Sequence, residues 1–426
     1  MDTIFAVSTG QPPAAIAVMR ISGQGAFDAV RALAGTLPEP RRAAVRALRH
    51  QGELLDRALV LLFPGPNSAT GEDLAELHLH GGRAVVHAVE TALASLSGLR
   101  GAEPGEFTRR ALTHGRIDLS EAEGLGDLLM AETEAQRRTA LRSAEGAVRR
   151  EVEGWTREAL GIAAGIEALL DHSDEDDVAG SADPVPAIRS ATARLGEKIE
   201  AVTRRPSVER LRDGIRVVLA GPPNAGKSTL LNALAERDAA IVSPVAGTTR
   251  DRIEAPVVRN GIAWLLTDTA GLTETADTVE RIGVARAEDA IAQADMLLWL
   301  GDDVAPQHDA VIAVHPRIDS EGRSGIPAGR LGVSAATGVG IDLLWREMSD
   351  RAQQLLPAGD QLALNRRQRE LAQAAATALH VAAGEQDLLL VAEGLRTGLR
   401  ALDAITGRAG VEAMLDTLFA RFCIGK

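Results

Sequence analysis

The segment GPPNAGKS at 221–228 has the spacing G-x-x-x-x-G-K-[ST] of a phosphate-binding loop. It follows the strand-like run IRVVLA and precedes the helix-like run STLLNALAER, which is the context such a loop requires. Backbone N–H groups of a glycine-rich loop at a helix N-terminus can surround phosphate oxygens. We expect Lys227 to reach the outer phosphates and Ser228 to ligate Mg²⁺. The contacts expected of this loop come from Asn224, Ala225, Gly226, Lys227, Ser228 and Thr229.

Two further motifs follow in the order typical of a GTPase. DTAG at 268–271 ends the apolar run AWLLTDTAG, where an aspartate can hold Mg²⁺ and the glycine N–H can sense the γ-phosphate. GTTRD at 247–251 lies between the two motifs and supplies a threonine hydroxyl, assigned to Thr249, that can complete the Mg²⁺ shell. Three motifs in this order predict a GTPase of the translation-factor-like class. The nucleotide contacts expected here are Thr248, Thr249, Asp268, Thr269, Ala270 and Gly271.

The segment that would read the base departs from the usual N-K-x-D pattern. After the strand-like VIAVH the chain has PRID at 316–319, in which Asp319 can accept from guanine N1 and N2. Pro316 cannot make the contacts of an asparagine side chain, so we expect weakened guanine selectivity. Ser334, Ala335 and Ala336 resemble the loop that backs the base. Leu272 stands where Ras-like enzymes place a water-orienting glutamine, so hydrolysis must be arranged differently.

Composition limits the function classes. The chain has 426 residues, 25% of them charged, with a net charge of −13 and 2% aromatics. An acidic chain poor in aromatics can contact RNA only through a local patch or a partner. No apolar run is long enough to span a membrane, the first residues lack the pattern of a signal peptide, and Cys423 is the only cysteine, so we expect a cytoplasmic protein. Arginine supplies 43 of the 46 basic residues, and lysine occurs only at Lys198, Lys227 and Lys426.

Changes in the pattern of apolar and polar residues divide the chain into four segments. Strand-like and helix-like runs mix over 1–116, which predicts a small α/β domain. Alanine-rich helical spacing covers 117–212 and returns over 355–426. Strand and helix patterns alternate over 213–354, which predicts a parallel sheet with crossover helices. We therefore expect a Ras-like G domain inserted into a helical domain, preceded by an α/β domain.

These motifs together resemble the tRNA modification GTPase family MnmE, also called TrmE. The resemblance covers essentially the whole chain. It rests on the P-loop, AGTTRD and DTAGL and also on VMRISG at 18–23, TGEDLAELHLHGG at 70–82, PGEFTRRA at 104–111, GRIDLSEAEGLGDLL at 115–129, VERIG at 279–283 and the terminal CIGK. The family implies homodimers through an N-terminal folate-binding domain. It also implies a heterotetramer with the flavoprotein MnmG, which installs a C5 aminomethyl-type group, such as carboxymethylaminomethyl, on the wobble uridine of tRNA.

The resemblance further implies that K⁺ stimulates GTP hydrolysis. Asn224, Ser243, Val245 and Thr248 match the potassium ligands, and Ser243 also counts among the nucleotide contacts. Glu280 of VERIG resembles the glutamate that positions the attacking water, whereas from the sequence alone it reads as an acid at a helix N-terminus. Glu280, Asn224 and Lys227 are thus the expected catalytic residues.

For the one-carbon donor, 5-formyl- or 5,10-methylene-tetrahydrofolate, the family pattern points to Arg20, Glu76, Arg116 and Lys426. A carboxylate such as Glu76 can accept from pterin N–H groups, and cations can pair with the glutamyl tail. His78 and His80 alternate on one strand face, but two ligands without a third favour a packed or hydrogen-bonded role over a metal site. A structural or folate-proximal role of Cys423 is at least as well supported as a nucleophilic one.

Two other function classes fit parts of the sequence. A GTP-gated RNA-binding assembly factor of the ribosome-maturation type would need a basic RNA-binding domain, which the net charge of −13 argues against. A folate-binding protein with a vestigial G domain is disfavoured by the intact phosphate and Mg²⁺ motifs.

Overall fold

A computed structural model describes residues 2–171, 184–236, 254–269, 280–359, 361–408, 415, 418–419, 422 and 424–425. The chain forms two compact units. The first comprises Met1–Gly126, Ser143–Glu153 and Leu402–Lys426, and the second comprises Asp127–Arg142 and Gly154–Ala401. Among the described residues, no helix combines the length and apolar character needed to cross a bilayer.

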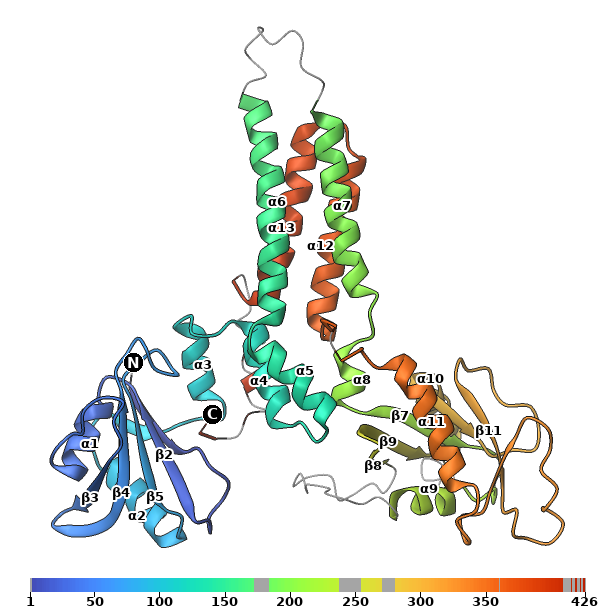
Figure 1. The fold of residues 1–426 in the computed structure, drawn as a ribbon, viewed down its shortest axis with the longest axis horizontal. Helices are drawn as coiled ribbons and strands as arrows, with labels where there is room; N and C mark the ends of the chain where they lie inside the picture. Colours follow the sequence, from blue (N-terminus) through green and yellow to red (C-terminus); the bar gives the residue numbers. More distant parts are fainter. Residues whose placement is uncertain are drawn as a thin grey trace. The chain divides into compact units, whose positions relative to one another are not determined.

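A six-stranded sheet with the order β3-β4-β5-β2-β1-β6 organises the first unit (Figure 1). Its strands are β1 (Thr3–Val7), β2 (Ile16–Ser22), β3 (Ala44–His50), β4 (Glu53–Phe63), β5 (Leu74–His80) and β6 (Leu99–Gly101). Only β1 and β6 pair in parallel. In β5, Ala75, Leu77 and Leu79 are buried and alternate with Glu76, His78 and His80, as its sequence pattern predicts.

Helices cover both faces of this sheet. Helices α1 (Ala26–Ala34) and α2 (Arg83–Ala94) place their apolar stripes on one face, where they share a core with β2, β4 and β5. On the other face, Phe107 of α3 (Glu106–Thr113) packs against Ile4, Ala6 and Leu74. The face that carries Arg20 and Glu76 is therefore the one that α3 partly covers.

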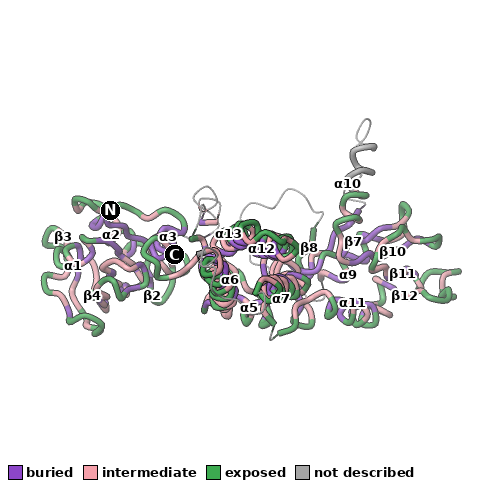
Figure 2. Tube along the Cα trace, turned by 90° about the horizontal axis from the view of Figure 1, so that it is seen from above, coloured by how far each residue is buried: buried purple, intermediate pink, exposed green. Residues whose placement is uncertain are grey.

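The alanine-rich segments form the helices expected of them. They are α4 (Leu119–Leu129), α5 (Glu134–Ala144), α6 (Ala147–Asp171), α7 (Val185–Thr203), α8 (Val208–Arg212), α12 (Arg366–Gly384) and α13 (Leu388–Thr406). Figures 1 and 2 show α6, α7, α12 and α13 side by side. Gly146, at φ +81°, separates α5 from α6. A capping box of Asn365 and Gln368 starts α12.

A second six-stranded sheet, with the order β12-β11-β10-β7-β9-β8, is formed by the part of the chain between α8 and α12. Its strands are β7 (Ile215–Ala220), β8 (Glu254–Arg259), β9 (Ile262–Asp268), β10 (Met296–Trp299), β11 (Val311–Pro316) and β12 (Leu331–Val333), all parallel except β8. Helices α9 (Lys227–Glu236), α10 (Glu280–Gln293) and α11 (Ile341–Leu355) accompany it. Trp264 and Trp345 meet edge to face in its core at 5.4 Å.

The two ends of this α/β segment lie close together. Val208 N donates to the Leu364 carbonyl oxygen at 3.4 Å, and Arg366 N donates to the Glu209 carboxylate at 2.6 Å. A chain that leaves and re-enters at one place can carry an inserted domain. The expected fold class, which combines an N-terminal α/β domain, a helical domain and an inserted P-loop domain, is confirmed.

Candidate functional site

The phosphate-binding loop lies between the end of β7 and the start of α9. Asn224 and Gly226 both adopt the left-handed region, at φ +60° and +94°, and this folds the loop back over the helix N-terminus. Lys227 is 7% exposed, and its Nζ donates to the carbonyl oxygens of Gly221 and Pro222 at 3.0 and 3.1 Å. The ammonium is therefore held at the mouth of the loop, where a phosphate would meet it.

Two of the three expected magnesium ligands, Ser228 and Asp268, are in contact. Parallel pairing sets Asp268, at the end of β9, opposite Leu219 of β7. The Ser228 hydroxyl donates to the Asp268 carboxylate, and Thr269 Oγ1 donates to the Leu219 carbonyl oxygen at 3.0 Å. A hydroxyl and a carboxylate oxygen are the hard donors that Mg²⁺ prefers, so these residues fit the ion chemically.

Two cavities adjoin the loop. One, of about 570 Å³, is lined by 223–229 with Thr269, and the other, of about 210 Å³, is lined by Thr229, Pro316, Asp319, Ala335 and Ala336. Arg317 lines both cavities, and Gly226 leaves room for its guanidinium beside the loop. The Ser334 hydroxyl accepts from Thr337 N at 3.1 Å and holds the loop behind the smaller cavity.

The PRID segment and the S-A-A loop therefore both line the smaller cavity, as expected from their order in the chain. Pro316 contributes to its wall at the end of β11. Asp319 is the carboxylate residue in this lining. A planar base whose edge carries two N–H donors matches that acceptor.

Several expected site residues lie outside the described part of the chain. They are Ser243, Val245, Thr248, Thr249, Ala270, Gly271 and Lys426, together with Cys423 and Leu272. Glu280 is the first residue of α10, which matches a helix N-terminal position. The assignments of the potassium ligands, of the nucleotide contacts outside the described residues and of Lys426 to the folate site therefore stay predictions.

A second polar site lies on the N-terminal sheet. Arg20 of β2 and Glu76 of β5 are directly paired, and Arg20 Nε donates to Glu76 Oε1 at 2.9 Å. His78 Nε2 lies 3.3 Å from the other Glu76 oxygen, and His80 Nδ1 lies 2.7 Å from Asp56. Both histidines thus have hydrogen-bond partners, as predicted. Among the described residues, no three metal-ligating side chains cluster.

Arg116 belongs to the same unit, just after α3, where its N donates to the Ala111 carbonyl oxygen at 2.8 Å. Its side chain packs beside Gly71, in the loop that leads into β5. Arg20 and Glu76 thus lie on the face that α3 partly covers, and Arg116 directly follows α3.

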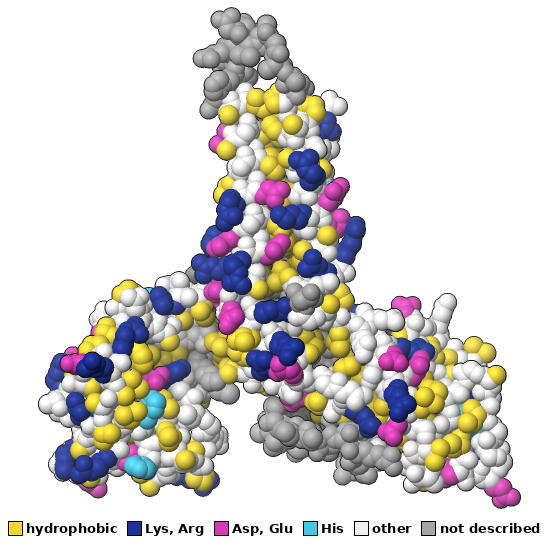
Figure 3. Space-filling model, in the orientation of Figure 1, with side chains coloured by type: hydrophobic (Ala, Val, Ile, Leu, Met, Phe, Trp, Pro, Cys, Tyr) yellow, Lys and Arg dark blue, Asp and Glu magenta, His cyan; other side chains and the backbone are white. Residues whose placement is uncertain are grey.

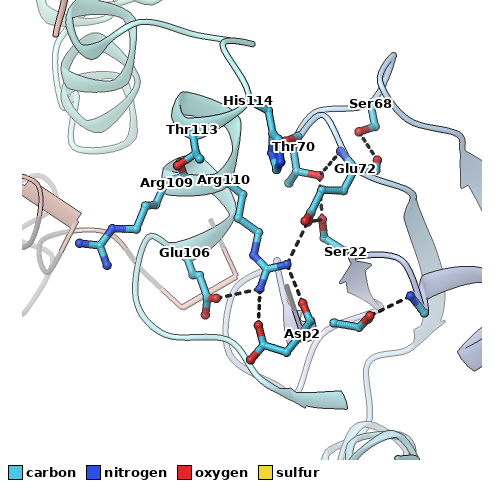
Figure 4. A network of polar contacts seen from close by, with 12 residues as sticks. Asp2, Ser22, Ser68, Thr70, Glu72, Glu106, Arg109, Arg110, Thr113 and His114 are labelled. Carbon is cyan, nitrogen blue, oxygen red and sulfur yellow. Dashed lines mark hydrogen bonds and ion pairs between the residues drawn. The ribbon is translucent and has the colours of Figure 1, made fainter. Parts of the chain in front are cut away.

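A buried ion network that sequence reasoning missed ties α3 to this sheet (Figure 4). Arg110 donates to Glu72 at 2.9 Å, Glu106 at 3.0 Å and Asp2 at 3.1 Å. Burial lowers the pKa of Arg110, but its bonds to Glu72 and Glu106 outweigh burial and raise it. Burial raises the pKa of Glu106, but bonds from Arg100, the Glu103 N–H and Arg110 lower it overall. One feature of the sequence could have indicated this network: Glu106 and Arg110 are four residues apart on one helix, a spacing at which two side chains can pair.

The described part of the C-terminal tail docks on the same unit. Phe419 and Phe422 are buried, Ile424 forms a bridge with Pro104, and the Ser8 hydroxyl donates to the Gly425 carbonyl oxygen at 2.7 Å. Ser8 N in turn donates to Val18 on β2, two residues from Arg20.

Known proteins match this chain over its whole length. Residues 3–116 match the family of the GTP-binding protein TrmE N-terminus, and residues 119–423 match the MnmE helical domain. A protein named tRNA modification GTPase MnmE from Erythrobacter litoralis is 53% identical over all of both chains. One of the same name from Rhizorhabdus wittichii is 57% identical over 100% of this chain and 97% of its own. The chain belongs to the MnmE family.

The family resemblance drawn from the motifs is thus confirmed for this MnmE-family chain. Among solved structures, the G domain of the T. maritima FeoB iron transporter is 26% identical, covers 33% of this chain and 99% of its own, and has a TM-score of 0.25.

Proposed function

We propose that this chain is a GTP hydrolase of tRNA modification. In this proposal it acts with the flavoprotein MnmG and a reduced folate to install a C5 aminomethyl-type group on the wobble uridine. The observation that carries the hydrolase part is the contact of Ser228 with Asp268 beside the phosphate loop and the buried Lys227. Relatives that match the whole chain are named tRNA modification GTPases, which supports the tRNA part.

The chain's own residues suit GTP binding and hydrolysis. Lys227 offers a fixed positive charge to the outer phosphates, and Asp319 offers an acceptor to the base. Ser228 and Asp268 would hold Mg²⁺, which when bound neutralises charge on the β- and γ-phosphates. In this proposal Asn224, Ser243, Val245 and Thr248 ligate K⁺, and Glu280 orients the attacking water.

The N-terminal polar site is proposed to bind the folate. Glu76 can accept from pterin N–H groups while Arg20 neutralises its charge at 2.9 Å. Arg116 and Lys426 would meet the glutamyl carboxylates. The docked C-terminal tail, which reaches Ser8 near the Arg20 strand, supports including Lys426.

The proposal also covers organisation and compartment. It assigns 1–116 to folate binding and homodimerisation, 213–354 to the G domain, and 117–212 with 355–426 to the helical domain. The matched ranges 3–116 and 119–423 are compatible with these boundaries. The cytoplasm, where tRNA and a reducing environment are found, is the proposed compartment.

Mass spectrometry of tRNA nucleosides tests the proposal. In a strain that lacks its own MnmE, the parental chain should restore the modified wobble uridine, whereas Asp268→Asn should not. A chain that hydrolyses GTP but leaves tRNA unmodified in the presence of the partner would favour the assembly-factor alternative. Restoration by Asp268→Asn would favour the folate-binding alternative with a vestigial G domain.

A further inference from the structure

Four arginines gather where α5, the α7–α8 linker and the start of α12 meet, all within the second unit. Arg142 donates to the Gln361 carbonyl oxygen at 3.5 Å, and Arg205 donates to the next carbonyl, that of Leu362, at 3.4 Å. Arg369 Nη2 donates to the Arg205 carbonyl oxygen at 2.6 Å. Arg366 is exposed one helical turn before Arg369. We call these four residues the arginine cluster.

The guanidiniums of Arg142, Arg205 and Arg369 donate to backbone carbonyl oxygens, whereas many exposed arginines of this acidic chain pair with carboxylates. Exposed arginines such as Arg137, Arg204 and Arg400 each pair with a carboxylate within 2.6–2.8 Å. Figure 3, in the orientation of Figure 1, shows dark blue and magenta side chains interspersed over the helices α6 and α7. No member of the arginine cluster forms an ion pair with a carboxylate among the described residues, which exclude Asp360.

One carboxylate, that of Glu209, contacts the cluster through the backbone of Arg366, and the other neighbouring carboxylates form no ion pair with it among the described residues. Glu209 accepts from the backbone N of Arg366, and Glu200 pairs with Arg204 at 2.8 Å. Glu370, one turn beyond Arg366, forms no ion pair with it in the described structure. The first N–H groups of α12 are already bonded to Asn365 and Glu209, so at this place the arginine side chains, and not the helix end, are the groups that could contact a phosphate.

Unneutralised guanidiniums repel one another, and arginine is suited to bidentate contacts with phosphate. Several such groups from three segments match a partner that carries a row of phosphates. With a net charge of −13, this chain can approach such a polyanion only through a local basic patch.

We propose that the arginine cluster binds the sugar–phosphate backbone of the tRNA on which the chain acts. This inference rests on the proposed function. Phosphate contacts carry no base information, so the cluster orients the tRNA and does not select it.

The test is binding of labelled tRNA by the full chain at several KCl concentrations. The double variant Arg142→Gln/Arg366→Gln should weaken binding and lower the slope of log K against log salt by about 1 for each arginine removed. Arg366→Lys, which keeps the charge, should retain most of the parental slope. The matched control is Arg396→Gln/Arg400→Gln on α13, with the same charge change and a carboxylate neighbour, Glu393. GTP turnover should stay parental in all three variants.

A parental slope in the first double variant would overturn the inference, as would an equal loss of slope in the control, because the effect would then be one of net charge. If the parental chain with its flavoprotein partner binds no tRNA, the tRNA part of the proposed function fails. If the parental chain binds tRNA and the double variant binds it in the same way, only the role of the arginine cluster is excluded.

Discussion

At the residue scale, Pro316 limits the polar contacts that a guanine base would find in the smaller cavity, the proposed base site. Its ring has neither an N–H nor a polar side chain, so in the proposed site Asp319 and backbone groups would have to read the base. A buried contact of this kind contributes about 1–3 kcal/mol. We expect Pro316→Asn to improve guanine discrimination by about tenfold or more over the parental chain, measured by competition of ATP and XTP against labelled GTP.

Pro327→Asn, at an exposed loop position, is the control for adding an asparagine. Equal selectivity of the parental chain and Pro316→Asn would mean that another group reads the base.

Asn224 carries the second prediction at this scale. It is exposed in the phosphate loop at φ +60°, so its side-chain amide can face a bound nucleotide or cation. Asn224→Ala should lose the acceleration of GTP hydrolysis by K⁺ over Na⁺ at equal ionic strength, while nucleotide affinity stays within a few-fold. Asn260→Ala removes an asparagine of similar backbone conformation, φ +55°, and should keep the K⁺ response. If the parental turnover is the same in KCl and NaCl, the potassium assignment is wrong.

At the scale of elements, the buried network holds α3 on the N-terminal sheet. Glu106 has a lowered pKa in the folded chain, so its contribution to stability is complete above about 4.5, its ordinary value, and is lost as the pH falls through the folded value. Breaking a buried ion pair costs about 3–5 kcal/mol. Glu106→Gln should therefore reduce hydrogen-exchange protection of the α3 amides strongly at pH 6. The difference from the parental chain should shrink below pH 4.5.

Glu39→Gln, which removes an exposed partner of Arg42, is the control and should leave α3 protection unchanged. A protection difference that does not vary with pH would contradict the ionic role of Glu106.

The elements also show what sequence patterns can and cannot predict. Periodicity located α1, α2, β5 and α9 because each buries one regular face. It did not single out β1 or β3: β1 has five residues, and β3 is an edge strand whose arginines blur its alternation. The sequence motif identified the phosphate loop because the residues that form this loop follow one another in the chain.

The ion network escaped prediction for the opposite reason. Asp2, Glu72 and Arg110 are far apart in the chain, and only the pairing of the sheet and the packing of α3 bring them together. The same holds for the arginine cluster, whose members come from 142, 205, 366 and 369. Spacing along the chain carries no information about such contacts.

At the scale of the whole molecule, the last residues return to the unit formed by the first. Gly425, at φ +94°, approaches the Val7 carbonyl so closely that a side chain would not fit there. Burial of Phe419 and Phe422 and the hydrogen bond from Ser8 fasten the tail beside the strands that carry the folate candidates. The G domain has a hydrophobic core of its own around Trp264 and Trp345.

Deleting 423–426 should therefore separate the proposed folate binding and tRNA modification from GTP hydrolysis. Loss of Lys426 removes a cation proposed to pair with folate carboxylates, so affinity for 5-formyltetrahydrofolate, measured by calorimetry, should fall by about tenfold or more, as expected for one charge-assisted contact. Modification of tRNA should be lost, while the GTPase rate should change less than twofold because the G-domain core is untouched. Gly425→Ala, which disturbs docking but keeps Lys426, should weaken folate binding in the same direction. Parental folate affinity in the truncated chain would exclude Lys426 from the folate site, whatever happened to modification.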